Sequence, residues 1–431
     1  MQRFRQSVGA GILAAAVLVP LASAEADAAI HDNPDLTWQT VGSLDSRGRN
    51  LNGRVEAVEY GRGPTAGRVY IGGDFTRVEP PRDESGSSVA RAHVAAFSRF
   101  GDNIVRRWKA TVKLGGSVGN ARVAALAISP DGKVLYVGGL FSSVNGKARG
   151  NVAALNAKTG RVLRWHPRTN LGVHSLEVGR DGRVYLGGPF TSVNGQQRLH
   201  IAAVRRKGGA LLGWSPDVTQ PEIDCPPRCA PDVYAMSLSK DVLYFGGSFA
   251  RVNGKHRNSA AAVTTGGRVT RWNPNVFSEG VRGSLNKVYD LAIAGKRVYL
   301  CGDFFRVDAF VTQNVAAVRR STGAIIKRFN FATDGGVNGC VVNGKAKALV
   351  VGGHFDHAGT RAGVRDDTAP VRRHVAAGGL ARGGLFAWNP ALNSVPGVWG
   401  VDTTGSKIGF GGDFTQVDGN VQKGFAQFGV S

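Results

Sequence analysis

A Gly-Gly-x-Phe signature that recurs along nearly the whole chain of 431 residues is the feature that most restricts its fold. Successive copies lie 49 to 66 residues apart, and one copy has Cys-Gly in place of the double glycine. They occur at Gly72–Phe75, Gly138–Phe141, Gly187–Phe190, Gly246–Phe249, Cys301–Phe304, Gly352–Phe355 and Gly411–Phe414. Self-similarity at such a period is typical of a protein built from one repeated supersecondary unit.

Each unit contains four short apolar runs separated by turn residues, and nothing between them has helical periodicity. Asp131-Gly132 and Asp181-Gly182 join the first two runs, and Asn145-Gly146 marks a bend between the second and third. The 61 glycines of the chain fit a protein with many tight turns. Four antiparallel strands repeated in series predict the blades of a propeller. The prediction is an all-β, seven-bladed β-propeller of four-stranded antiparallel blades.

The two ends of the chain suggest how such a ring closes. The last unit stops after its third run, and an orphan strand containing Trp38 stands near the N-terminus. We therefore expect an N-terminal strand near residues 35–42 to complete the last blade, which hides sheet edges that would otherwise be exposed. This divides the chain into a leader at 1–24, a segment at 25–54 with the closing strand, and a propeller at 55–431.

Residues 1–24 have the pattern of a secretory signal peptide. Arg3 and Arg5 precede an apolar stretch, and Ala22-Ser23-Ala24 offers a small-residue cleavage site. The alternative, a membrane anchor, is disfavoured because the apolar run is short, and no later segment has the length to span a bilayer. The sequence thus predicts a secreted or cell-wall-associated protein, and we expect a monomer.

The strong positive charge predicts what the surface attracts. The formal net charge is +23, so a chain without the two leader arginines carries +21. Such a basic protein attracts polyanions such as wall polymers and acidic glycans. Nucleic acid is a poor match, because the basic residues are spread along the chain and the leader predicts export.

Four cysteines in an exported protein favour two disulfide bonds. Cys225 and Cys229 could close a small loop, which leaves Cys301 and Cys340 as the second pair. The alternative is a metal site with Cys-x-x-x-Cys ligands, but histidine is missing at a useful spacing. His354 and His357 form a lone H-x-x-H beside a strand end, which is a weak metal signal. No metal and no cofactor are expected.

The repeated unit V-Y-x-G-G-x-F-x-x-V-N-G, followed by N-V-A-A and W-x-P, resembles the delta-sixty type propeller repeat of exported bacterial proteins. It is more distantly similar to repeats of fungal cortical polarity-marker proteins. The resemblance covers residues 55–431 and implies an exported propeller, but it supplies no catalytic residues. The sixth and seventh units depart from the pattern, with valine or glycine at the tyrosine position.

The second position of each innermost strand predicts a collar around the central channel. Varied polar and aromatic residues stand there, whereas packing alone would favour one repeated residue. The predicted ligand-binding residues are Glu56, His174, Tyr234, Tyr289 and Asn338, joined by Asp290 at the next position; Ala124 and Pro396 occupy the remaining two places. Tyrosines would stack on a sugar or ring, and polar groups would form hydrogen bonds. The alternative is a water-filled channel that binds nothing.

Basic residues after the Asn-Gly bends predict a positive rim on the face where the channel opens. They are Lys147, Arg149, Arg198, Lys255 and Arg257, and the alternative is ordinary solvated turn charge. Two loops exceed the repeat template, at residues 79–91 and 358–373. Long loops on a rigid scaffold carry recognition in many proteins, although a tolerated insertion explains them equally well.

Together these patterns favour an exported, non-catalytic protein that binds an anionic glycan or cell-wall polymer through the mouth of the propeller. One alternative is an enzyme at the channel mouth that acts on polysaccharides or uses a quinone. Its acid–base residues would come from Glu56, His174, Tyr234 and Asp290. The other alternative is a scaffold for protein partners. No residue is assigned as catalytic.

Overall fold

The structure is a computed structural model that describes residues 29–41, 43–44, 50–51, 53–220, 230–278, 286–359, 369–393 and 397–431. The predicted leader, the Cys225–Cys229 pair, Pro396 and most of the loop at 358–373 lie outside the described residues. The described part contains no helix with the length and apolar character that crossing a bilayer requires. Its two helices are short 3-10 turns, η1 (Gly63–Thr65) and η2 (Arg99–Gly101).

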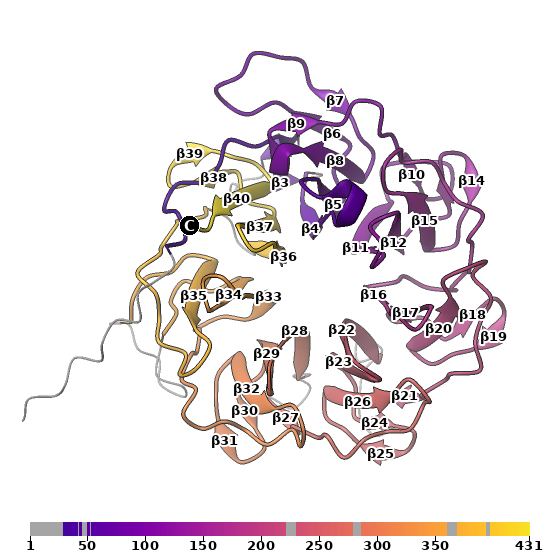
Figure 1. Ribbon diagram of the computed structural model, residues 1–431, viewed down its shortest axis with the longest axis vertical. Helices are drawn as coiled ribbons and strands as arrows, with labels where there is room; N and C mark the ends of the chain where they lie inside the picture. Colours follow the sequence, from indigo (N-terminus) through magenta and orange to yellow (C-terminus); the bar gives the residue numbers. More distant parts are fainter. Residues whose placement is uncertain are drawn as a thin grey trace, which may run out of the picture.

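Antiparallel sheets are arranged side by side in a ring, each with its first strand toward the middle (Figure 1). We call them radial sheets and name each by its first strand. The β4 sheet contains β4 (Val55–Tyr60), β5 (Val69–Gly73), β8 (Val94–Ser98) and β9 (Asn103–Ile104). The next three contain β11 (Arg122–Ile128), β12 (Val134–Leu140) and β15 (Val152–Asn156); β16 (Ser175–Val178), β17 (Arg183–Gly187) and β20 (Ile201–Arg205); and β22 (Asp232–Ser239), β23 (Val242–Ser248) and β26 (Ala260–Thr264).

The ring continues with three further radial sheets toward the C-terminus. They contain β28 (Lys287–Ala294), β29 (Arg297–Asp303) and β32 (Val315–Arg319); β33 (Val337–Asn343), β34 (Ala348–Gly353) and β35 (Val375–Gly379); and β36 (Val398–Thr403), β37 (Lys407–Gly412) and β40 (Phe425–Gly429). The first strand of the β36 sheet packs against β4, so the last and first radial sheets are neighbours.

Most radial sheets have three strands, whereas the sequence predicted four in every blade. The fourth run meets the third strand at a single bridge, as in Leu155↔Val162 and Val204↔Leu211. It then leaves the ladder because its tryptophan points to the next sheet. The Trp165 indole N–H donates to the Arg205 carbonyl at 2.9 Å, and the Trp272 indole N–H donates to the Arg319 carbonyl at 3.1 Å. Except in the β4 sheet, where β9 pairs with β8, the fourth run therefore connects adjacent sheets and does not extend one.

The double glycine is required because two neighbours approach it closely. A Cβ on Gly138 would lie 2.8 Å from Val173 in the next radial sheet. A Cβ on Gly139 would lie 2.1 Å from the Arg122 carbonyl oxygen in its own sheet. In the β28 sheet, Cys301 replaces the first glycine, and its side chain forms a disulfide with Cys340 of β33, with Cα atoms 6.4 Å apart. The Cys301–Cys340 bond is thus present, as the cysteine pattern predicted.

Small outer sheets link consecutive radial sheets at the perimeter. In three of the four three-stranded ones, a strand that follows one unit pairs with the hairpin of the next, and in the first one a strand of the N-terminal segment, β1, takes that place. They are β1 (Gln39–Val41), β6 (Arg77–Glu79) and β7 (Val89–Ala90); β10 (Val112–Lys113), β13 (Ser143–Val144) and β14 (Lys147–Ala148); β21 (Val218–Thr219), β24 (Arg251–Val252) and β25 (Lys255–His256); and β27 (Val276–Phe277), β30 (Arg306–Val307) and β31 (Phe310–Val311). The two-stranded ones are β18 (Ser192–Val193) with β19 (Gln196–Gln197), β38 (Gln416–Val417) with β39 (Asn420–Val421), and β2 (Ser43–Leu44) with β3 (Asn50–Leu51).

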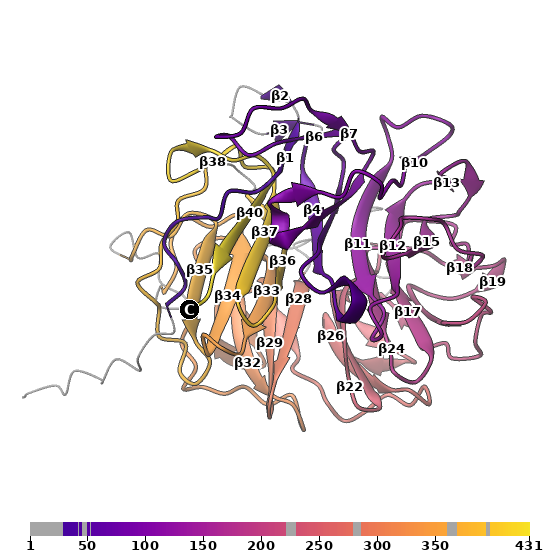
Figure 2. The same ribbon diagram turned by 45° about the horizontal axis from the view of Figure 1, so that its top comes forward.

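The first described residues, from Ala29 on, run beside the C-terminal strand β40 (Figure 2). The His31 amide donates to the Gly429 carbonyl at 3.0 Å, and the Asp35 amide donates to the Gln427 carbonyl at 2.8 Å. Trp38 is buried and stacks against Phe97 of the β4 sheet at 6.5 Å. Further along, Gln39–Val41 pairs with β6 of the first outer sheet. The N-terminal segment thus contacts both the last and the first radial sheets.

The core is divided among the spaces between radial sheets. One cluster joins Tyr70 and Trp108 from the first unit to Val123 and Leu135 of the β11 sheet, and similar clusters follow around the ring. Pairing of apolar faces between neighbouring sheets leaves the innermost strands free to expose selected side chains toward the middle. Those strands therefore define the candidate site.

Candidate functional site

A β-bulge near the start of nearly every innermost strand directs one side chain of that strand into the channel. In β4 the pairing shifts between Val55 and Ala57, and in β22 it shifts between Val233 and Ala235. The extra residue is Glu56 in the first case and Tyr234 in the second. Because a bulge adds a residue and redirects its side chain, the strands direct varied residues into the channel while the valines before them remain in the core.

A central cavity of about 380 Å³ lies among these bulges. All six predicted collar residues line it: Glu56, His174, Tyr234, Tyr289, Asp290 and Asn338. The volume is at the lower end of the range for small-molecule sites. The sequence pattern therefore brings together the correct residues around one concavity, and their role in binding stays a prediction.

Two arginines and a tryptophan share one side of the cavity with Glu56. The Arg54 guanidinium lies 2.6 Å from the Glu56 carboxylate and 5.0 Å from the centre of the Trp399 ring, a cation–π contact. Arg122 lies 4.0 Å from the same carboxylate and keeps 39% of its side chain exposed. Arg54 lies 3.5 Å from the Asp74 carboxylate as well, so two carboxylates balance the two guanidinium groups, and Arg122 is the more exposed cation on this side.

A row of rings continues around the cavity from Arg122. His174 stacks on Tyr234 with ring centres 6.2 Å apart, and Tyr234 meets Tyr289 at 5.3 Å. Burial, with a smaller effect of Asp232, raises the pKa of Tyr234, so its hydroxyl stays protonated. The Asp232 carboxylate lies 2.8 Å from His174 Nδ1 and orients the imidazole, whose Nε2 lies 3.3 Å from Arg122. The rings provide stacking surfaces beside a cation.

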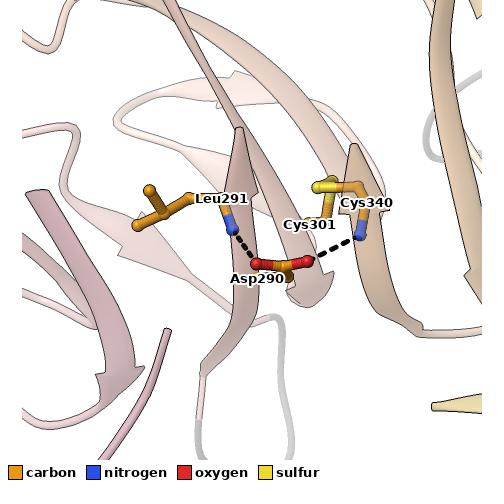
Figure 3. The surroundings of a disulfide bond; sticks show 4 residues. All are labelled: Asp290, Leu291, Cys301 and Cys340. Atoms are coloured by element: carbon orange, nitrogen blue, oxygen red, sulfur yellow. Dashed lines mark hydrogen bonds between the residues drawn. A yellow bond between two sulfur atoms is a disulfide. The ribbon is translucent and has the colours of Figure 1, made fainter. Parts of the chain in front are cut away.

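Asp290 differs from the other collar residues because its two oxygens already accept backbone hydrogen bonds. They accept from the amides of Leu291 and Cys340, both at 2.8 Å, and Cys340 belongs to the next radial sheet (Figure 3). Burial raises the pKa of Asp290 to about 7. The carboxyl group connects two sheets next to the Cys301–Cys340 disulfide.

Three more carboxyl groups, each half-buried, connect innermost strands in the same way, deeper along the channel. Glu59 accepts from the Ile128 amide at 3.2 Å, Glu177 from Leu238 at 3.3 Å and Asp402 from Tyr60 at 2.7 Å. Burial raises the pKa of Glu177 to about 7 and that of Asp402 to about 6. Burial, followed by the charge of Asp402, raises the pKa of Glu59 as well. These groups stabilise the ring.

Sequence reasoning missed Trp399, Arg54 and Arg122. The bulge of the last radial sheet lies between Val398 and Gly400, so Trp399 takes the position that the sequence analysis gave to Pro396. The poor fit of proline to a strand interior was the available signal. Arg54 directly precedes Val55, and Arg122 directly precedes Val123. The collar pattern begins at these valines, so both arginines lie one position outside it.

The predicted basic rim is not at the channel mouth. β14, β19 and β25 lie at the perimeter of the ring (Figure 1), which places Lys147 and Lys255 far from the innermost strands. Arg149, Arg198 and Arg257 each donate to the carbonyl of the preceding residue and to one in the fourth run: Leu163, Leu212 and Thr270, respectively. They are repeated structural contacts because they fill the gap where the ladder ends.

The described residues offer no cluster of three or more metal-ligating side chains. His357 Nδ1 pairs with the Asp334 carboxylate at 2.8 Å, and His354 Nε2 accepts from the Gly336 amide at 3.1 Å. Both histidines therefore have local partners. The described part of the long loop at 79–91 lies at the outer edge of the ring, next to β6 and β7 (Figure 1).

The ring of antiparallel sheets defines an all-β propeller. Comparisons with a family model and with solved structures support the same fold. A family model described as a domain of unknown function (DUF5122) beta-propeller matches residues 129–160 and 179–202. The solved WD40 repeats of RRP9 superpose with a TM-score of 0.53 at 11% identity, covering 93% of this chain and 99% of that one. The structure of U3-55K gives a TM-score of 0.53 at 10% identity, covering 93% and 100%. At such identity the likeness concerns the fold alone. No curated protein matches the sequence.

Proposed function

We propose that this chain is an exported binding protein that recognises an anionic glycan or cell-wall polymer at the central cavity. The observation that carries the proposal is the row His174–Tyr234–Tyr289, which begins beside the exposed cation Arg122 and lines the same cavity as Arg54. Aromatic faces suit sugar rings, and guanidinium groups suit carboxylate, sulfate or phosphate groups.

The finer description of the fold belongs to the same proposal. We infer a propeller of seven blades in which each radial sheet with its fourth run forms one blade, closed by the N-terminal segment along β40. The amide contact Asp35–Gln427 supports closure because Val105–Ala96 is its counterpart in the β4 sheet, and Trp38 and Trp108 each follow three residues later. We further propose that the repeat is of the delta-sixty type, that the protein is a monomer, and that export removes residues 1–24. The N-terminal sequence of secreted protein should then begin at Glu25.

The test is co-sedimentation of the protein, without its leader, with purified cell-wall material across a salt series. Binding should persist at about 150 mM salt, where the Debye length is about 8 Å, because stacking does not depend on long-range charge. A Tyr234→Ala, Tyr289→Ala double variant should lose most of it. The matched control is Phe277→Ala, Phe310→Ala, which removes two partly exposed aromatic rings from an outer sheet. Loss of binding at moderate salt in wild type and variants alike would leave charge attraction alone and refute a cavity site.

An enzyme at the same cavity is the second candidate, and the His174–Asp232 pair favours it. A carboxylate at 2.8 Å from Nδ1 orients the imidazole, as in a general base, and a substrate would have to displace Arg122 from its place 3.3 Å from Nε2. Asp290 is less suited because both of its oxygens are engaged. Turnover of polysaccharides or alcohols by wild type, abolished in His174→Ala, would support the enzyme over the pure binder. A propeller also serves as a scaffold for partners.

A further inference from the structure

A second concavity lies on the outer part of the β28 sheet and is lined by cations. We name it the outer cationic pocket; its volume is about 560 Å³. Lys296, Arg297, Arg319, Lys327 and Arg328 line it, with two isoleucines as its apolar surface. No Asp or Glu lines it, and none of these five side chains forms an ion pair within the described part of the chain. All of the cations except Arg297 are exposed.

Comparison with the β16 sheet shows how this charge arises. Arg297 stands opposite Arg319 in the pairing of β29 with β32, as Arg183 stands opposite Arg205 in the pairing of β17 with β20. In both sheets the first arginine donates to a carbonyl of the following unit, which is Leu380 or Thr265. Like charges directly opposite one another destabilise a sheet.

The β16 sheet contains a compensating acid that the β28 sheet lacks. Asp181 lies in the hairpin turn before β17, with its carboxylate 3.7 Å from Arg183. The corresponding turn of the β28 sheet is Gly295-Lys296, so a cation stands where an acid would neutralise the pair. The β22 sheet has Asp241 in its two-residue turn Lys240-Asp241. The β28 sheet thus carries an opposed arginine pair without the acid that accompanies the same pair in the β16 sheet.

The pocket is separate from the central cavity. Tyr289 and Asp290 line the cavity near the start of β28, and the strand then continues to Ala294 before the turn that carries Lys296. At about 3.3 Å per residue, the turn lies at least 15 Å further along the sheet. A ligand in one concavity therefore does not occupy the other.

We propose that the outer cationic pocket is a second binding site, for the closely spaced oxyanion groups of a polyanionic chain. Converging guanidinium and ammonium groups without acids repel one another, and an anionic ligand relieves that repulsion. Arginine presents paired donors that match the two oxygens of a carboxylate, sulfate or phosphate group. The isoleucines Ile325 and Ile326 give the polymer backbone an apolar surface. The site goes beyond the function proposed for the central cavity and does not depend on it.

The test compares Lys296→Asp with Lys147→Asp, which changes the net charge equally at an exposed perimeter residue. Each variant is titrated with labelled heparin, polygalacturonate and inorganic polyphosphate at about 150 mM salt, where long-range attraction is largely screened. Lys296→Asp should weaken binding of at least one polymer about tenfold or more, because it converts an attractive contact into a repulsive one and pairs with Arg297. Lys147→Asp should change affinity by less than about threefold.

The three polymers distinguish sulfate, carboxylate and phosphate as the preferred group, and inorganic sulfate alone tests whether a chain is needed. Equal weakening by both variants, or no weakening by Lys296→Asp, would overturn the proposal. Asp241 shows that aspartate fits such a turn. If melting shows that Lys296→Asp is not folded, the exposed pair Lys327→Gln, Arg328→Gln decides instead. Co-sedimentation of the Tyr234→Ala, Tyr289→Ala variant reports on the central cavity, whereas the comparison of Lys296→Asp with Lys147→Asp reports on this pocket, so failure here is distinguishable from failure of the cavity proposal.

Discussion

Replacement of Asp290 by asparagine should reduce the pH dependence of stability. Burial raises the pKa of Asp290 to about 7, against 3.8 for an ordinary aspartate. Between these values the folded protein keeps a proton that the unfolded chain has released. The free energy of unfolding must therefore fall as the pH rises through this window, and it stays low above the folded pKa. This is the opposite of the usual behaviour of a salt-bridged aspartate.

The expected magnitude follows from the width of the window. From pH 5 to pH 8, about two pH units at ~1.4 kcal/mol each give roughly 2–3 kcal/mol from this group. Because Asp290 keeps partial access to the cavity, water reduces the effect, and we expect about 2 kcal/mol. Glu177 and Asp402 add contributions of the same sign.

The assay is equilibrium urea unfolding of wild type and Asp290→Asn at pH 5 and pH 8, followed by tryptophan fluorescence. The asparagine amide cannot accept both backbone hydrogen bonds, so the variant should lose about 1–3 kcal/mol at pH 5. Between pH 5 and pH 8, the free energy of unfolding of the variant should fall by about 2 kcal/mol less than that of wild type. Asp83→Asn, whose wild-type side chain is 59% exposed, is the control and should match wild type.

The same pH dependence in wild type and Asp290→Asn would refute the reasoning, because it would mean that Asp290 is ionised in the folded protein at pH 5. A wild type that gains stability between pH 5 and pH 8 would also contradict the sign for the buried carboxyl groups as a set.

Three further predictions concern stability. Replacing Cys301 and Cys340 by serine should cost about 4 kcal/mol in the chain-entropy account, because the bond spans 39 residues of sequence; urea unfolding with and without reductant measures it. Trp38→Ala should cost about 3–5 kcal/mol, since the ring is buried between the N-terminal segment and the β4 sheet, and a melting midpoint unchanged from wild type would contradict this contact. Arg149→Lys should lower the free energy of unfolding by about 1–3 kcal/mol, because the lysine loses hydrogen bonds to backbone carbonyls. Lys147→Ala, two residues away, should change it by no more than about 0.5 kcal/mol. Thermal melts of the two variants decide whether the basic residues after the bend are structural or free.

The repeated residues predicted the propeller because each of them makes a contact that recurs from one unit to the next. Gly138 and Gly139 recur because neighbours approach within 3 Å of an added Cβ, and Trp165 recurs because its indole N–H reaches the next sheet. Cys301 replaces one of these glycines, and the space is filled by a disulfide. Departures from a repeat were therefore as informative as the repeat itself.

The sequence was less informative about pairing and about charge. Nothing in the letters showed that the fourth run leaves the ladder after one bridge, as at Val204↔Leu211, since the tertiary contact of Trp214 decides it. The basic rim was wrong for a similar reason. Arg149 looked like a solvated turn residue, but the end of the ladder leaves carbonyl groups that only a long donor can reach. Trp399 was missed because two valine-x-glycine patterns follow one another at Val395 and Val398.

One bulged strand assigns different roles to two adjacent collar residues, and this bears on which function the cavity can have. Tyr289 is the extra residue of its bulge and lines the cavity, whereas Asp290 resumes the ladder and gives its oxygens to backbone amides. Glu59, Glu177 and Asp402 make equivalent contacts deeper in the channel. Buried carboxyl groups with raised pKa values are candidates for acid–base catalysis, but here the same feature recurs in several sheets with the same backbone partners. A recurring structural contact is the simpler cause, which leaves His174 as the collar residue best placed for chemistry and the tyrosines and arginines for binding.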